Sequence, residues 1–311
     1  MTNGLPQLNH SLFVTDAGLE TVMIFKKGIN LPEFASFVML EDALQTELLR
    51  QYYEQYVAIA HTYKAGLILE APTWRANRDW GQKIGYSEAA LAELNKRAIA
   101  FLRDIRSEFK TAQSPMVVSG CVGPRGDGYN PTSQMDADTA AQYHASQIAA
   151  FKAAGADMVN AMTITYPEEA IGIARAATTV GIPAAISFTV ETDGHLPCGT
   201  SLQIAIEQVD RETNRTPVYY MINCAHPTHF QSVLTADEAW TNRIYGIRAN
   251  ASRKSHAELD ESETLDSGSS QVLGREYAEL KQQLHNLTIL GGCCGTDSRH
   301  VEAICKAYIE S

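Results

Sequence analysis

The chain has 311 residues, of which 45% are hydrophobic and 20% are charged, and its formal net charge is −11 at pH 7. This composition excludes an intrinsically disordered chain, and the acidic balance argues against a nucleic-acid partner. No apolar run approaches the about 20 residues that a membrane-spanning helix needs, and the first ten residues lack the features of a signal peptide, so we expect a cytoplasmic protein with no membrane partner.

One pattern recurs along the chain: a segment with helical periodicity, then a glycine, then a short apolar run. Within 42–65, apolar residues recur at spacings of three and four, and Gly66 follows where a left-handed helix cap is expected. Gly155 and Gly181 occupy the same place before two later apolar runs. The pattern indicates strands that alternate with helices.

The apolar runs predict eight strands, near 11–15, 67–71, 116–120, 157–162, 184–189, 217–222, 244–247 and 287–291. Helical segments separate or follow them, near 42–65, 87–110, 136–153, 167–179, 200–212, 226–234, 270–284 and 297–310. Eight such pairs without a long linker favour a closed parallel barrel over an open sheet. We therefore predict an α/β fold with a single (β/α)8 TIM barrel domain over residues 1–311, although the length alone also permits two domains.

Residues that carry chemistry follow the predicted strands, where the active sites of such barrels lie. They are, in chain order, Asp16, Gly18 and Glu20, then Glu70 and Thr73, residues 123–125, Thr163, Glu191 and Asp193, Cys224, Asn250, and the pair Cys293 and Cys294. We expect all of them on one face of the barrel.

Three of the six cysteines lie at the expected mouths of strands six and eight: Cys224 in MINCAHP, and Cys293 with Cys294 in ILGGCCGT. Soft thiolates select zinc, and three protein ligands leave its fourth tetrahedral position for a substrate. The adjacent pair is also compatible with a redox-sensitive site or with plain packing, and packing is our interpretation of Cys121, Cys198 and Cys305.

Two histidines are alternative ligands for such a metal. His226 and His229 follow Cys224 closely, but the proline between them favours the first turn of a helix. We therefore expect both histidines at the surface.

The segments DAGLET at 16–21, NC at 223–224 and GGCCGT at 291–296 resemble the homocysteine S-methyltransferase family, and the similarity extends over nearly the whole chain. The resemblance implies a (β/α)8 barrel in which Cys224, Cys293 and Cys294 bind Zn2+ and the thiol of homocysteine takes the fourth position as a thiolate. Zinc suits this role because it deprotonates a thiol, whose pKa is otherwise about 8.5, and no general base is then needed for methyl transfer. The methyl donor is expected to be a cation and the product methionine.

With this resemblance we predict a substrate-binding set after strands one, four, five and six, comprising Asp16, Gly18, Glu20, Thr21, Met162, Thr163, Glu191 and Asn223. The first motif reads DAG where DGG is common in the family. For Asp16, a helix cap or a hydrogen bond that fixes the DAGLET turn is the alternative role.

The chain departs from the family after strand four, where an acidic residue is expected to hold the amino group of homocysteine. The corresponding segment is NAMTITYPEEA, which places Met162 at that position. Glu168 and Glu169 follow a proline, which favours the first turn of the next helix rather than a replacement role.

Three other carboxylates are candidates to supply the missing charge, namely Glu20, Glu70 and Glu191; their alternative roles are helix caps and surface charges. Trp74 and Trp80 flank a short polar loop, where an aromatic face either receives a cationic methyl donor or packs in the core. Two longer segments, 121–135 and 248–270, are expected at the rim, the first as a turn and the second as a surface segment or a lid.

We therefore predict a zinc-dependent S-methyltransferase in methionine biosynthesis, with homocysteine as the acceptor and a sulfonium such as S-methylmethionine or S-adenosylmethionine as the donor. A different thiol or selenol acceptor is the alternative within this class, because Met162 suits a substrate without an α-amino group. A zinc-storage or redox-sensing module is the alternative of another class, and such a closed site recruits a fourth protein ligand, for example His226. The sequence does not indicate an oligomeric state.

Overall fold

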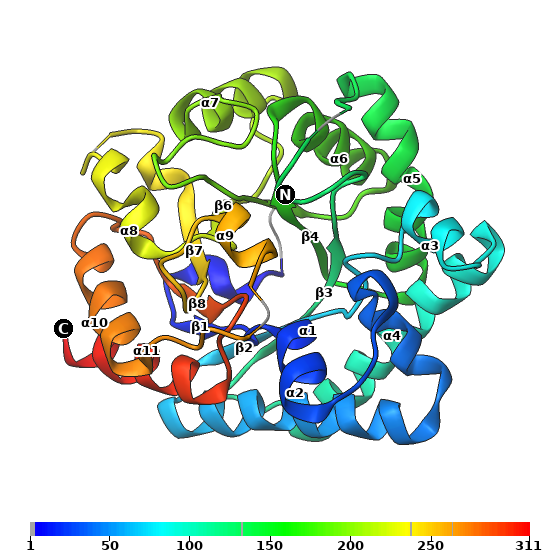
Figure 1. The fold of residues 1–311 in the computed structure, drawn as a ribbon, viewed down its shortest axis with the longest axis horizontal. Coiled ribbons are helices and arrows are strands. Elements are labelled where there is room, and N and C mark those ends of the chain that lie inside the picture. The colour runs from blue at the N-terminus through cyan, green and yellow to red at the C-terminus, as the bar shows by residue number, and fades with distance from the viewer. Residues whose placement is uncertain (1–3, 132, 237, 263) are drawn as a thin grey trace.

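In the computed structural model, which describes residues 4–131, 133–236, 238–262 and 264–311, the strands form a closed parallel barrel in the order β1 to β8, with β8 paired to β1 (Figure 1). The predicted TIM barrel is confirmed. The strands are β1 Phe13–Val14, β2 Gly66–Glu70, β3 Met116–Val122, β4 Met158–Ile164, β5 Ala184–Phe188, β6 Tyr220–Asn223, β7 Ile244–Ala249 and β8 Ile289–Gly292.

Helices form a ring around the barrel (Figure 1). The longer ones are α2 Ala43–Tyr63, α4 Glu88–Phe109, α5 Ala137–Ala154, α6 Pro167–Val180, α7 Leu202–Thr213, α10 Ser270–Lys281 and α11 Ser298–Glu310. Four short α-helices accompany them: α1 Leu19–Thr21, α3 Arg78–Lys83, α8 Pro227–Phe230 and α9 His256–Asp260. Short 3-10 or π turns cover Pro6–Asn9, Val22–Lys26, Pro32–Phe34, Ser36–Glu41, Gln231–Val233 and Thr241–Arg243.

Every predicted strand and helix overlaps an observed element, and the differences are local. The helix predicted over 226–234 is the short α8 followed by a 3-10 turn. The short helices α1, α3 and α9 were not predicted because they lie within polar loops, although the capping box of Ser255 and Glu258 at the start of α9 is a recognisable sequence signal. Residues 132 and 263 of the two predicted rim segments lie outside the described residues.

The glycine predictions are confirmed at two positions and wrong at one. Gly155 and Gly181 cap α5 and α6 in the left-handed conformation, with φ of 84° and 69°. The cap of α2 is instead Lys64, with φ of 51°. Gly66 begins β2, where a Cβ atom would lie 2.2 Å from the ring of Phe13, so glycine is required there by packing inside the barrel.

The barrel interior is apolar in one half and polar in the other. Side chains near the first residues of the strands form an apolar cluster of Leu5, Phe13, Ile68, Val117, Met158, Ala185, Tyr219, Met221 and Ile289. Because alternate residues of a strand share one face, Glu70, Asn160, Asn223 and Arg248 continue these interior rows toward the C-terminal ends. This polar layer forms the floor beneath the loops that follow the strands.

Among the described residues, no helix combines the length and the apolar character that crossing a bilayer requires.

The buried carboxyl of Glu70 makes the polar layer sensitive to pH. Its Oε1 accepts a hydrogen bond of 2.9 Å from Asn160 Nδ2. Burial raises the pKa of Glu70 from 4.5 to about 7, although the positive charge of Arg248 opposes this shift. The native state therefore binds a proton more tightly than the unfolded chain does, and this contribution to stability is lost as the pH rises from 4.5 through about 7.

We predict that Glu70→Gln removes this part of the pH dependence. Between about pH 5 and about pH 8, the unfolding free energy of the unsubstituted protein should fall by up to about 3 kcal/mol. The variant should not show this loss, because its neutral amide does not titrate. Urea unfolding followed by circular dichroism over this range measures the difference. Glu93→Gln, whose side chain is 73% exposed, is the matched control, and parallel profiles for Glu70→Gln and the unsubstituted protein would contradict the assignment.

Candidate metal centre

The three predicted cysteines meet at one point. Cys224 follows β6, and Cys293 and Cys294 follow β8, so all three lie at the C-terminal ends of the strands. Their sulfur atoms lie within 4.8 Å of one another, with 2.6 Å between the Sγ atoms of Cys224 and Cys293 and 3.8 Å between those of Cys224 and Cys294. Among the described histidine, cysteine and acidic residues, these three cysteines form the group that is close enough together to hold a metal ion.

Close backbone packing directs the cysteine pair. The amide of Cys293 donates to the carbonyl oxygen of Ala249 on β7, and Thr296 Oγ1 donates to the carbonyl oxygen of Cys293 at 2.6 Å. Gly292 is required because a Cβ atom there would lie 2.1 Å from Thr296 Oγ1, and Gly295 adopts a φ of 78°. The turn is tight enough for the side chains of both Cys293 and Cys294 to reach Cys224, which follows β6.

Cys224 has an unusual backbone conformation, with φ of 55°. A non-glycine residue in this region is strained by about 1 to 3 kcal/mol and needs support from its surroundings. Asn250 Nδ2 donates to the carbonyl oxygen of Cys224 at 2.9 Å, and His256 Nε2 donates to the same oxygen at 2.7 Å. These contacts hold the strained residue so that its sulfur faces the pair from β8.

The three thiols share their protons unequally. Hydrogen bonds from Cys293 and Cys294 lower the pKa of Cys224, and the same contacts raise the pKa of Cys293 to about 12 and that of Cys294 above its usual value. Three adjacent thiolates repel one another strongly, so complete ionisation requires a cation among them. Zinc fits this donor set because it prefers thiolates and takes four ligands, of which these residues supply three.

The two histidines weighed as alternative ligands lie outside the cluster. His226 caps α8 and its Nε2 lies 3.2 Å from Glu276 Oε2, while His229 lies 2.9 Å from the carbonyl oxygen of Arg253. Both occur at the start of α8 as predicted, but they are buried, so the expectation of surface positions is wrong. Burial lowers the pKa of His226 to about 4, so it is neutral at physiological pH.

Two residues that were not predicted lie beside the thiols: Tyr129 contacts the sulfur atoms, and His256 packs behind it. The hydroxyl of Tyr129 lies 3.6 Å from Cys224 Sγ and 3.7 Å from Cys294 Sγ. Its ring stacks on His256, with 4.1 Å between the ring centroids. Both residues belong to the predicted rim segments, but only the segments, and not these side chains, were recognisable because their function here depends on tertiary contact.

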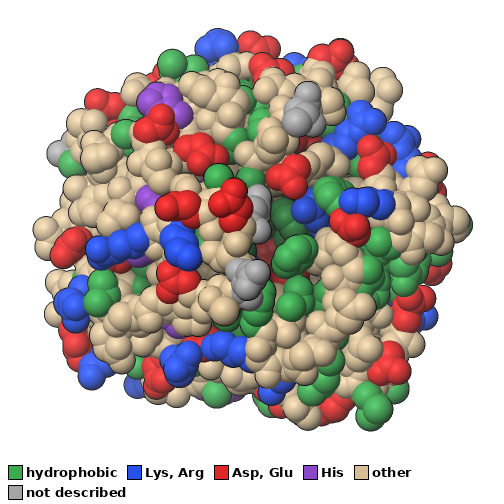
Figure 2. All heavy atoms as spheres, viewed as in Figure 1, with side chains coloured by type: hydrophobic (Ala, Val, Ile, Leu, Met, Phe, Trp, Pro, Cys, Tyr) green, Lys and Arg blue, Asp and Glu red, His purple; other side chains and the backbone are tan. Residues whose placement is uncertain are grey.

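Glu191, predicted to bind substrate, contacts His256 rather than the thiols. Its Oε1 lies 3.0 Å from His256 Nδ1, and about a third of its side chain is exposed. The helix α9 that carries His256 lies within the ring of longer helices (Figure 1). The face seen in Figure 1 is hollowed near its middle, and hydrophobic side chains gather at the edge of the hollow (Figure 2).

The DAGLET segment packs directly against the cysteine turn. A Cβ atom on Gly18 would lie 2.4 Å from the carbonyl oxygen of Cys293, and Thr21 Oγ1 accepts a hydrogen bond of 3.2 Å from the amide of Gly295. Glu20 Oε1 accepts a hydrogen bond of 2.8 Å from Ser36. Burial raises the pKa of Glu20, and the negative charges of Asp16 and Cys293 add to this effect.

The structure contradicts one of the two alternative roles considered for Asp16. It does not cap α1, because its carboxylate pairs with Arg248 Nη2 at 2.8 Å and accepts a hydrogen bond of 3.0 Å from the hydroxyl of Tyr52. Both partners also contact the backbone of Ala17, so Asp16 helps to fix the DAGLET segment through them. Burial raises the pKa of Asp16, and the charge of Arg248 opposes that shift. Arg248 also donates to the carbonyl oxygens of Gly292 and Ala17, so this ion pair joins β7, β8 and the DAGLET segment.

Asn223 connects the cysteine site to β4. Its Oδ1 accepts from the amide of Thr163 at 2.9 Å and from Ser187 Oγ at 2.6 Å, and its Nδ2 donates to Thr163 Oγ1 at 2.8 Å. Thr163 has a φ of 62°, so Asn223 stabilises a strained residue. Met162, directly before it, is 5% exposed and lies on the same face of β4 as Asn160.

The aromatic surface considered for a cationic donor is already covered. The guanidinium of Arg75 stacks on Trp74 and on Trp80, with its Cζ 4.0 Å and 3.6 Å from the two ring centroids. The two indole rings therefore bind a cation that belongs to the chain itself, which is neither of the two roles considered for them.

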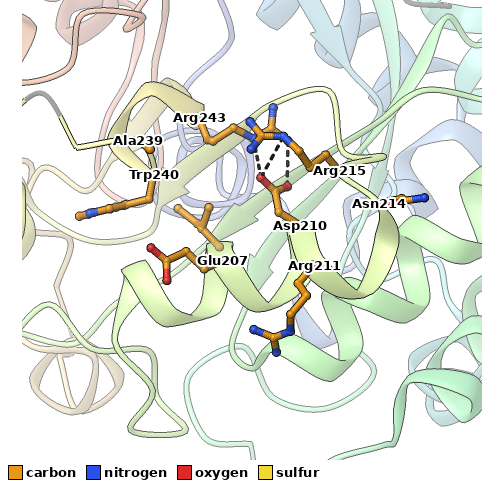
Figure 3. Close-up of a pocket in the computed structure, with 9 residues that line it drawn as sticks. Glu207, Asp210, Arg211, Asn214, Arg215, Ala239, Trp240 and Arg243 are labelled. Carbon is orange, nitrogen blue, oxygen red and sulfur yellow. Dashed lines mark hydrogen bonds and ion pairs between the residues drawn. The ribbon is translucent and has the colours of Figure 1, made fainter.

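A surface pocket of about 500 Å3 lies elsewhere, between α7 and the segment that precedes β7. Asn214 comes before β6 and Arg243 before β7, so the pocket is near the N-terminal ends of the strands. Figure 3 shows Arg243 and Arg215 directed at the carboxylate of Asp210, and Arg243 donates to it at 2.9 Å and 3.0 Å. This pocket contains none of the predicted site residues.

Comparison with known proteins agrees with this geometry. A family model described as Homocysteine S-methyltransferase matches residues 13–308. The fold is similar to crystal structures of the homocysteine methyltransferase MmuM from Escherichia coli: the metallated form has 19% sequence identity, covers 97% of this chain and 96% of that chain, and gives a TM-score of 0.73. The oxidised form has 20% identity, covers 95% of each chain and gives a TM-score of 0.75.

Comparison with curated protein sequences gives no significant match. The family match nevertheless includes every strand of the barrel and all three clustered cysteines, so the resemblance indicated by DAGLET, NC and GGCCGT is confirmed. The chain belongs to the homocysteine S-methyltransferase family.

Proposed function

We propose that this chain is a zinc-dependent S-methyltransferase that moves a methyl group from a sulfonium donor, such as S-methylmethionine or S-adenosylmethionine, to homocysteine. The observation that carries the proposal is the convergence of three thiols, from two turns far apart in the sequence, at the C-terminal mouth of the barrel. The metallated form of the MmuM protein supports zinc or a similar ion as the cofactor.

Cys224, Cys293 and Cys294 would hold the metal, which supplies the acidity that converts an acceptor thiol into a nucleophilic thiolate at neutral pH. The chain itself positions these ligands through their backbone groups, which bond to the carbonyl oxygen of Ala249 and to the side chains of Thr296 and Asn250. Tyr129 contacts two of the sulfur atoms, and His256 stacks on the ring of Tyr129 and so fixes its position. The remaining requirement is alignment of the acceptor sulfur with the methyl group of the donor.

Glu20 is our candidate for the ammonium group of homocysteine. Asp16 is already paired with Arg248, and Glu169 lies 3.0 Å from His144 Nε2 and accepts from the amide of Arg125. The charge of Glu20 interacts with that of Cys293. Within the described part of the chain, the carboxylate of Glu20 accepts a hydrogen bond from the side chain of Ser36. A carboxylate with spare acceptor capacity near the thiols suits an ammonium group.

A second candidate function is methylation of a different thiol or a selenol. The observation that favours it is the buried Met162, whose apolar side chain stands where the family commonly places an acidic residue. The third reading, a closed zinc-storage site, finds less support because His226 faces Glu276 rather than the sulfur atoms.

We predict that Cys224→Ser and Cys293→Ser each lose bound zinc, since the remaining sulfur atoms cannot complete the site. Metal analysis of purified protein should give about one zinc per chain before substitution and far less afterwards. Cys198→Ser is the matched control because Cys198 lies outside the cluster, and it should retain the metal. Loss of zinc from His226→Ala would contradict the open site and favour the storage reading.

We also predict that the zinc-loaded protein binds L-homocysteine with release of a proton. Glu20→Gln should weaken this binding about ten- to a hundredfold, because it removes a charge-assisted hydrogen bond to the ammonium group. Calorimetric titration should be run beside 4-mercaptobutanoate, which lacks the amino group and should bind both proteins equally.

Glu33→Gln is the control for this titration, since Glu33 is a partly exposed carboxylate that pairs with Lys83. Binding of 4-mercaptobutanoate but not of homocysteine would reject homocysteine as the acceptor and favour the second candidate. Binding of neither thiol would argue against an open thiol site.

A further inference from the structure

Arg75 is a buried cation at the rim of the barrel mouth. It follows β2 in the segment that precedes α3, and the residue is 7% exposed. Its guanidinium lies between the rings of Trp74 and Trp80. Stacking between the two rings therefore fixes the orientation of the planar group.

The charge of Arg75 is not neutralised by a close anion. Within the described part of the chain, no carboxylate oxygen lies within 4.0 Å of its nitrogen atoms. Its Nη1 donates a hydrogen bond of 3.3 Å to the carbonyl oxygen of Gly126. The Nε atom is buried and has no hydrogen-bond partner. By contrast, the buried Arg248 has Asp16 at 2.8 Å.

A buried charge without a partner destabilises the folded protein, so we expect such a group to bind an anion in the functional complex. Burial lowers the pKa of Arg75 to about 10, and the more distant charges of Asp127 and Glu20 oppose that shift. The guanidinium therefore remains protonated at neutral pH. Five fixed N–H donors in a planar fork match the two oxygens of a carboxylate.

Packing connects Arg75 to the thiol cluster. The indole Nε1 of Trp74 donates to the carbonyl oxygen of Met162 at 3.2 Å, and a Cβ atom on Gly128 would lie 3.2 Å from the same indole ring. The residue after Gly128 is Tyr129, whose hydroxyl lies 3.6 Å from Cys224 Sγ. Trp74 thus contacts both Arg75 and the segments that carry Met162 and Tyr129.

We propose that Arg75 binds the carboxylate of a substrate at this site, either that of the thiol acceptor or that of a sulfonium donor. This inference rests on the proposed function and adds an anion-binding group that the matched motifs do not contain. The charge of Glu20 acts on Arg75 although the two side chains do not pair with each other. Their opposite charges match those of the ammonium and carboxylate groups of an α-amino acid.

The test compares substrates with and without the carboxylate. Zinc-loaded protein is titrated with L-homocysteine and with 3-mercaptopropylamine, and separately with S-methylmethionine and with (3-aminopropyl)dimethylsulfonium. Each titration is repeated with Arg75→Met, with Arg75→Lys, and with Arg78→Met as the matched control, because Arg78 is a half-exposed arginine at the start of α3, three residues further along the chain. Zinc content and the urea midpoint are measured for every variant.

We expect Arg75→Met to weaken binding of one carboxylate-bearing compound by about ten- to a hundredfold, while its partner without the carboxylate binds as before. The affected pair identifies the source, acceptor or donor. Arg75→Lys should restore part of the affinity, and Arg78→Met should change neither ratio.

Equal weakening of both members of each pair, or no weakening of either, would overturn the proposal and leave Arg75 as a structural clamp between two indole rings. These outcomes are distinct from failure of the proposed function, because in them the thiol without a carboxylate still binds to the zinc-loaded protein. Absence of all thiol binding in the unsubstituted protein would instead reject the zinc-thiol site itself. If Arg75→Met does not fold, the Arg75→Lys ratios decide.

Discussion

The turn after β8 lies against both of its neighbours in the barrel, and the geometry of the thiol cluster depends on this contact. Gly292 donates its amide to the carbonyl oxygen of Asp16 at 3.1 Å, while the amide of Cys293 donates to Ala249 on β7 at 2.8 Å. Because β8 closes the barrel by pairing with β1, the cysteine turn is held from two sides. A small displacement of either neighbour would move two of the three sulfur atoms.

Local strain accompanies this arrangement. Both Cys224 and Thr163 have positive φ values, and each is stabilised by an asparagine that also contacts the site, Asn250 and Asn223 respectively. Backbone strain of this kind concentrates where a side chain must point in a direction that regular structure does not allow. The asparagines therefore serve the placement of the sulfur atoms as well as the stability of the barrel.

The charges around the mouth fall into two groups. Asp16 and Arg248 compensate each other within the floor of the site, and Glu70 contributes to the same buried layer. Glu20 and Arg75 have no such mutual contact, and each keeps hydrogen-bonding capacity. The first group stabilises the barrel interior, whereas the second is the pair that we propose to bind charged substrates.

The order of the strands and helices, the barrel and the three clustered cysteines followed from the sequence alone, because hydrophobic periodicity and the motifs around Cys224 and Cys293 are local properties of the chain. The sequence also placed the candidate site at the mouth of the barrel, since every motif follows a strand. Only the tertiary structure decided which of these groups already have partners: Asp16 pairs with Arg248, and the two indole rings stack on Arg75. It also showed that His226 lies beside Glu276 and away from the thiols. It alone brought Tyr129 against the thiols and His256 against Tyr129. These pairings join residues far apart in the chain, and no local pattern encodes which distant partner reaches a given side chain once the barrel closes.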